Sequence, residues 1–191
     1  MCHNWVTLPD GVVMSKYDSP IAYQTIPPST TVGSHMIVEI QEIFNPSKFY
    51  INVLDERTIQ PLDEMMGLMH AYYNVNHKNL EMVRECVYEG NYCAAQYDGI
   101  WHRAIILGKI GMVDEHTLIQ YIDYGTIMRI RLSELYFLHH EFTRLPIQGL
   151  LSKSNYQLKT IEDFRAKIDG GIVKAVYKGV EDDGRISLEI L

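Results

Sequence analysis

Between residues 91 and 138, the chain consists of short β-forming runs separated by tight turn signals. Asp98-Gly99 and Asp123-Tyr124-Gly125 mark two of these turns, because glycine accepts backbone conformations that other residues resist. The expected strands are Tyr92 to Tyr97, Ile100 to Leu107, Thr117 to Ile122, Ile127 to Arg131 and Tyr136 to Leu138. Strands this short and this closely spaced predict a small antiparallel barrel, since closure removes exposed strand edges.

The regions on either side of this expected barrel carry their own strand and helix signals. Pro61 stands in the favoured first turn of a helix, and apolar residues at spacings of three and four follow it as far as Tyr73. Downstream, Thr160-Ile161-Glu162-Asp163 resembles a capping box at the start of a short helix. The further strands expected are residues 35 to 43, 49 to 54, 172 to 177 and 185 to 191. The predicted fold class is therefore mainly β with a few helices.

The charge of the chain favours basic partners. It has 17 Lys and Arg residues against 24 Asp and Glu residues, which gives a formal net charge of −7. Binding to nucleic acid depends largely on cations that neutralise phosphates, so an acidic chain is poorly suited to it. An arginine-rich protein tail suits this charge better.

Features of membrane and secreted proteins are not evident in the sequence. No apolar run approaches the roughly 20 residues that a membrane-spanning helix needs, and no signal peptide is recognisable. The three cysteines have no CxxC spacing, and we expect free thiols in a reducing compartment. These features predict an intracellular protein.

An aromatic cluster is the candidate functional feature. Trp101 is expected to fill the barrel interior, and strand alternation places His102 on the opposite face. If the strands meet as in a small barrel, Tyr97, His102, Tyr121 and Tyr124 gather at one rim. Ring faces attract cations, and a flat guanidinium stacks between rings at low desolvation cost. The alternative is that these tyrosines only pack the barrel.

Four short motifs in order resemble the extended Tudor domain. They are the strand Asn45-Pro46-Ser47-Lys48-Phe49-Tyr50-Ile51, the strand Trp101-His102-Arg103-Ala104, the turn Tyr121-Ile122-Asp123-Tyr124-Gly125-Thr126, and the segment Phe142-Thr143-Arg144-Leu145-Pro146-Ile147-Gln148-Gly149. The resemblance spans roughly residues 33 to 191. It implies a small antiparallel Tudor barrel inserted into a split OB-type, staphylococcal-nuclease-like domain.

The resemblance also implies a division of the chain. Residues 1–32 are expected to form an irregular lead-in, and residues 33–88 the first part of the nuclease-like fold with a linker helix. Residues 89–142 then form the Tudor barrel, and residues 143–191 complete the nuclease-like fold.

The family function implied is recognition of symmetrically dimethylated arginine, without catalysis or a cofactor. The site residues carried over are Tyr97, His102, Tyr121, Asp123, Tyr124 and Thr126. His102 stands where the family usually has Tyr or Phe, and Thr126 where it usually has Asn. An imidazole stacks when neutral but repels a cation once protonated, below its ordinary pKa of about 6.5. Strict dependence on methylation is therefore not expected.

The partners implied by the resemblance are arginine-rich tails of Piwi/Argonaute-family proteins, together with other Tudor-type scaffold proteins. RNA would be contacted only indirectly, and no membrane is involved. The setting implied is the piRNA pathway of transposon silencing, in the cytoplasmic, perinuclear germ granules called nuage.

Three alternatives stay open beside this hypothesis. A nuclease needs clustered carboxylates for a metal, but Asp63-Glu64 and Asp182-Asp183 lack evident active-site spacing, and the adjacent His139-His140 are expected to point apart. A scaffold with a degenerate cage would bind unmethylated partners through another surface. The OB-type half would alternatively bind single-stranded RNA by aromatic stacking.

Overall fold

The computed structural model describes residues 5–7, 13–15, 21–26, 30–109, 115–154, 160–168 and 170–191. The chain divides into two compact units. The open-sheet unit contains Pro61–Ile122 and Ile127–Pro146, together with the N-terminal residues up to Ala22. The barrel unit contains Tyr23–Gln60, Asp123–Thr126 and Ile147–Leu191.

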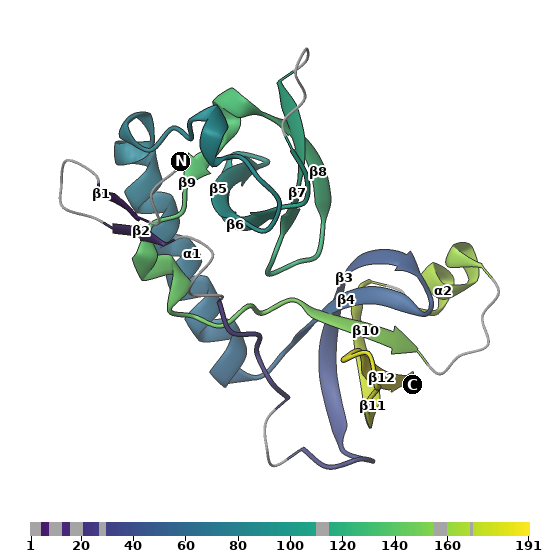
Figure 1. The fold of residues 1–191 in the computed structure, drawn as a ribbon. Helices are drawn as coiled ribbons and strands as arrows, with labels where there is room; N and C mark the ends of the chain where they lie inside the picture. The colour runs from purple at the N-terminus through teal and green to yellow at the C-terminus, as the bar shows by residue number, and fades with distance from the viewer. Residues whose placement is uncertain are drawn as a thin grey trace. The chain divides into compact units, whose positions relative to one another are not determined.

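The open-sheet unit is built on five antiparallel strands in the order β8-β7-β6-β5-β9, which curve strongly (Figure 1). The strands are β5 Tyr92–Tyr97, β6 Ile100–Ile106, β7 His116–Tyr121, β8 Ile127–Arg131 and β9 Tyr136–Phe137. All five lie where the sequence predicted strands. Among the described residues, β8 and β9 are the edges of this sheet, so the predicted Tudor barrel is a strongly curved sheet whose two edge strands do not pair with each other.

The two faces of this sheet are buried against different partners. Cys93, Ala104 and Ile119 belong to the hydrophobic core enclosed by the curved sheet. Trp101 points the other way, where its ring stacks on Tyr73 with centroids 4.9 Å apart. The prediction that Trp101 fills the barrel interior is therefore wrong. Strand alternation separates the two faces of a strand but does not tell which one is enclosed.

The helix α1, Glu56–Asn76, supplies the surface that receives Trp101. Its buried stripe includes Leu62, Met65, Met69 and Tyr73, as the apolar spacing predicted. The unit boundary falls inside this helix, at Pro61. From Pro61 onward the helix groups with the open sheet, whereas the division by sequence assigned it to the nuclease-like part.

The barrel unit is a closed five-stranded barrel in the order β10-β12-β11-β3-β4 (Figure 1). Its strands are β3 His35–Asn45, β4 Lys48–Val53, β10 Leu150–Ser154, β11 Ile172–Val180 and β12 Ile186–Ile190. Direct pairing of β3 with β11 and of β4 with β10 joins segments that flank the open-sheet unit in the sequence. This is the split barrel that the sequence predicted.

The helix α2, Ile161–Lys167, packs against the barrel core. The Thr160 side chain accepts a hydrogen bond from the Asp163 amide at 3.0 Å, as the capping pattern predicted. Phe164 is fully buried, and its ring centroid lies 5.0 Å from that of Phe49.

The remaining elements are short. They are the strands β1 Trp5–Thr7 and β2 Val13–Ser15 and the 3-10 helices η1 His77–Asn79, η2 Arg84–Cys86, η3 Leu132–Glu134 and η4 His140–Thr143. No helix among the described residues is long and apolar enough to cross a bilayer.

The cysteines only partly match the prediction of free thiols. Cys93 is free and fully buried in the open-sheet core, and burial raises the pKa of its thiol far above the ordinary value. Cys86 is disulfide-bonded, contrary to that prediction.

Candidate functional site

Three aromatic side chains of the open-sheet unit contact one another on the enclosed face of β5, β6 and β7. The ring centroids of Tyr97 and His102 lie 6.2 Å apart, those of Tyr97 and Tyr121 5.7 Å, and those of His102 and Tyr121 5.4 Å. The strand register brings them together, because His102 pairs with Ala95 on β5 while Tyr121 pairs with Ala104 on β6. The small alanines leave room for the rings. We call these three residues the aromatic triad.

The members of the triad differ in exposure. Tyr97 is 43% exposed, His102 is half-buried and Tyr121 is only 2% exposed. The Tyr121 hydroxyl donates a hydrogen bond to the Gln96 carbonyl at 2.7 Å, and burial raises the pKa of this phenol above its ordinary range. The Tyr121 side chain is therefore fixed, neutral and buried, whereas the Tyr97 ring is exposed to solvent.

The rings of the triad meet edge to face, with interplanar angles between 66° and 83°. A flat cation held between two parallel ring faces needs them about 7 Å apart, which is twice the usual contact distance. The triad rings thus stand at steep angles to one another and leave no gap between two parallel ring faces. In this arrangement, a cation reaches the exposed ring of Tyr97 first.

The loop Asp123–Thr126 carries the other predicted site residues and groups with the barrel unit. Tyr124 and Thr126 are half-buried there. Asp123 is 1% exposed, and its carboxylate accepts a hydrogen bond from the Gln148 amide at 3.0 Å. The structure gives Asp123 a role in fixing the loop. The contact with peptide that the sequence predicted for Asp123 stays a prediction, and in this structure its carboxylate accepts the backbone amide of Gln148 instead.

Two further contacts fix the same loop within the barrel unit. The Asn52 side-chain amide donates to the carbonyl oxygens of Asp123 at 3.0 Å and Gln148 at 3.1 Å. Gly125 has a φ of 86°, and a Cβ atom there would lie 2.2 Å from the Tyr50 ring. Glycine is required at this position both by the backbone and by the space. The loop that carries Tyr124 is therefore held on both sides.

Arg103 supports the strand that carries His102, a role that the sequence did not reveal. Its guanidinium is fully buried and donates to the carbonyls of Phe142 at 2.8 Å, Leu145 at 2.6 Å and Pro146 at 3.1 Å. Two of the motifs noted in the sequence are thus joined in space. The presence of both motifs in one sequence was the only sign of this contact. A hydrogen bond from a side chain to a backbone carbonyl far along the chain leaves no local sequence pattern.

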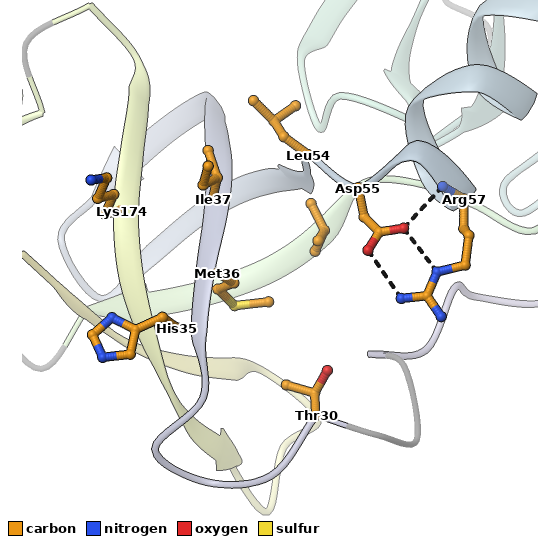
Figure 2. Close-up of a pocket in the computed structure, with 9 residues that line it drawn as sticks. Thr30, His35, Met36, Ile37, Leu54, Asp55, Arg57 and Lys174 are labelled. Carbon is orange, nitrogen blue, oxygen red and sulfur yellow. Dashed lines mark hydrogen bonds and ion pairs between the residues drawn. The ribbon is translucent and has the colours of Figure 1, made fainter.

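The described residues offer no clear metal centre, since they contain no group of three or more His, Cys, Asp or Glu side chains that could hold an ion. A pocket of about 430 Å³ in the barrel unit contains Lys174, His35 and the Asp55–Arg57 ion pair (Figure 2). Figure 2 shows the Asp55 carboxylate facing Arg57, so these two charges satisfy each other. A second pocket of the barrel unit, of about 580 Å³, is lined in part by Tyr23, Tyr50 and Tyr177.

The fold is that of an extended Tudor domain. The chain is similar to the extended Tudor domain TD3 of mouse TDRD1 in complex with a MILI peptide containing dimethylarginine, with a TM-score of 0.74 and 20% identity over 90% of this chain and 87% of that chain. It is also similar to the extended Tudor domain of BmPAPI in complex with sDMA, with a TM-score of 0.71 and 19% identity over 83% of this chain and 88% of that chain.

The Tudor domain family model matches residues 30–152, and the chain belongs to this family. Tudor domain-containing protein 7A of Danio rerio is 30% identical over 149 residues, which are 75% of this chain and 13% of that protein. RING finger protein 17 of Mus musculus is 26% identical over 141 residues, which are 73% of this chain and 8% of that protein. The chain thus spans a small part of the relatives that it matches.

Proposed function

We propose that this module binds an arginine side chain of a partner protein through the aromatic triad, without catalysing a reaction. The observation that carries the proposal is the mutual contact of Tyr97, His102 and Tyr121, at 5.4–6.2 Å between centroids, with the Tyr97 ring exposed. A guanidinium stacks on such rings because it is flat, always charged and weakly hydrated. Tyr97 would turn away from Tyr121 to admit the cation between their faces.

The partner proposed is an arginine-containing tail of a Piwi-type protein, unmethylated or symmetrically dimethylated. The net charge of −7 favours such a basic tail. Similar extended Tudor domains support the same partner class, since one is in complex with the MILI peptide, and one, from Drosophila melanogaster Papi, with a Piwi N-terminal R10me2s peptide. The module would then act as a scaffold in germline transposon silencing, in cytoplasmic perinuclear granules.

Calorimetric titration with two matched peptides, one with arginine and one with symmetric dimethylarginine, tests the proposal. Tyr97→Ala is expected to weaken binding by about 3- to 30-fold, which corresponds to the loss of one cation–π contact. Tyr124→Ala, at the other aromatic position carried over from the family motif, is expected to weaken it comparably. Tyr23→Ala is the matched control, because Tyr23 is 69% exposed and is neither in the triad nor in the four family motifs.

Two results would refute the assignment. One is that neither peptide binds the unchanged protein. The other is that Tyr97→Ala and Tyr124→Ala bind as well as the unchanged protein does.

Single-stranded RNA is the second candidate ligand, through the barrel unit. Three tyrosines line its pocket of about 580 Å³, and tyrosine rings stack on bases. RNA binding would fall steeply with salt, whereas arginine binding in the triad would fall modestly. A salt series with an oligonucleotide and with the arginine peptide separates the two.

A further inference from the structure

One face of α1 remains exposed although it is apolar at its centre. The buried stripe of this helix contains Met69 and Tyr73, which are fully covered. On the other side, Leu68 is 66% exposed and Val75 is 80% exposed, and Gly67 and Ala71 are exposed as well. Ala71 lies four residues from Gly67 and from Val75 and three residues from Leu68, so these four residues share one face. We call them the α1 face.

Gly67 has no explanation within the folded chain. It lies in the interior of a helix of 21 residues, where glycine makes the helix less stable than alanine would. Its φ lies outside the positive range, and no described heavy atom beyond its chain neighbours and the backbone of its own helix lies within 4 Å of the place where its Cβ would be. A glycine on a helix surface does allow another backbone or a bulky side chain to approach closely.

The α1 face is self-complementary in an antiparallel arrangement. Gly67 and Val75 are equally far from Ala71 in the sequence, and so are Glu64 and Lys78. If two copies of α1 cross antiparallel with a two-fold axis at Ala71, Val75 of each copy packs over Gly67 of the other. Glu64 of each copy then lies at the level of Lys78 of the other.

The charges of Glu64 and Lys78 favour the antiparallel orientation of the two helices over the parallel one. Glu64 is exposed near the start of α1, and Lys78 is exposed in η1, which directly follows the helix. An antiparallel pair brings opposite charges together at both ends and also opposes the two helix dipoles. A parallel pair would place Glu64 beside Glu64 and Lys78 beside Lys78.

We infer that this module self-associates through the α1 face as an antiparallel two-fold dimer with a second copy of this chain. The contact runs along about 21 Å of helix from Glu64 to Lys78. It is smaller than a standard protein interface, so the dimer is weak and forms at high micromolar protein concentration. The interface is isologous, because the same residues face each other in both copies.

Sedimentation equilibrium of the whole 191-residue chain, from about 10 μM to about 1 mM, tests the inference. The unchanged chain is expected to show a concentration-dependent dimer. Glu64→Lys alone and Lys78→Glu alone are each expected to weaken it about fivefold or more, because each places like charges together twice. The double variant Glu64→Lys/Lys78→Glu is expected to restore the dimer, and so is an equimolar mixture of the two single variants.

Oxidative cross-linking gives a second measurement that does not depend on charge. Ala71→Cys lies on the two-fold axis and is expected to form a covalent dimer under mild oxidation. Lys174→Cys is the matched control, since Lys174 is exposed on β11 of the barrel unit and should remain monomeric. The inference is overturned if the unchanged chain is monomeric at every concentration, if the mixture fails to restore the dimer, or if both cysteine variants cross-link equally.

Discussion

The Arg103 guanidinium donates a hydrogen bond to the carbonyl oxygen of Phe142 at 2.8 Å, across 39 positions of the sequence. The same group also holds the carbonyls of Leu145 and Pro146. A buried arginine thus fixes the segment that leads out of the open-sheet unit toward β10. It does so from the strand that carries His102.

Arg103→Met is therefore expected to lower the free energy of unfolding by about 3 kcal/mol or more, because it leaves buried carbonyl oxygens without a donor. Arg103→Lys keeps the charge but not the fork of donors, so a loss of about 1 kcal/mol or more is expected. Urea denaturation measures both. Arg144→Met is the control, since the Arg144 side chain is 72% exposed and pairs with Glu141 at the surface. Equal losses at the two positions would contradict the role of Arg103.

Gly125 and Tyr50 lie so close together that a side chain at residue 125 would meet the Tyr50 ring. Gly125→Ala combines a φ of 86° with a Cβ placed 2.2 Å from the Tyr50 ring. Gly99→Ala has a similar φ of 78° but open space around it. We expect Gly125→Ala to cost about 1–3 kcal/mol more than Gly99→Ala, which is the usual range for overpacking. Thermal and urea unfolding of both variants measure the difference.

A second background separates the clash from the backbone strain. In a Tyr50→Ala chain, the cost of Gly125→Ala should fall toward the level found at Gly99 but stay above it, because the Cβ atom of residue 50 remains 2.8 Å from the added one. An unchanged cost would mean that the ring is not what excludes a side chain at residue 125.

The strands and the aromatic contacts were accessible from the sequence because they depend on local patterns. Turn glycines and runs of β-forming residues located β5 to β8. Alternation along paired strands then predicted the contact of Tyr97, His102 and Tyr121, which the structure contains. Whether these rings bind arginine stays a prediction.

Other features depend on packing between distant segments and could not be read locally. Both faces of β6 are buried, so the face of Trp101 was decided by the presence of α1, on which its indole donates to Asn74 at 3.0 Å. Asp123 lies in a recognisable turn, but its buried role depends on Gln148. The sequence motif predicted the position of Asp123 in a turn but not its hydrogen bond with Gln148.

The start of α1 gives a prediction about pH. The Asp55 carboxylate accepts hydrogen bonds from the Arg57 side chain and amide, each 2.9 Å from Oδ1, and these bonds lower the pKa of Asp55 to about 2. The folded-state pKa lies below the ordinary value of 3.8, so the stabilisation is complete above that value and is lost as the pH falls through about 2. Asp55→Asn should therefore be less stable than the unchanged chain at pH 5, and the gap should close toward pH 2.

Urea denaturation between pH 2 and pH 6, without added salt, measures the difference in the free energy of unfolding between Asp55→Asn and the unchanged chain. Arg57→Met is the control background, since it removes the side-chain donor and should flatten most of the pH dependence of the gap. A gap that stays constant or widens at low pH would contradict the assignment.

The two departures from the family pattern give the last prediction. His102→Tyr replaces an imidazole, which repels a cation once it is protonated, with a ring that stays neutral between pH 5.5 and pH 7.5. If the triad binds arginine, the affinity of the unchanged chain should fall by several-fold from pH 7.5 to pH 5.5, whereas His102→Tyr should bind more tightly and lose this pH dependence. Thr126→Asn should raise the affinity further, because an amide can hydrogen-bond a guanidinium where the hydroxyl offers a single group. Peptide titrations at both pH values measure these effects. His35→Tyr, an exposed histidine in the barrel unit, is the control that should leave the pH dependence unchanged. If His35→Tyr flattens the profile and His102→Tyr does not, the cation is bound elsewhere than at the triad.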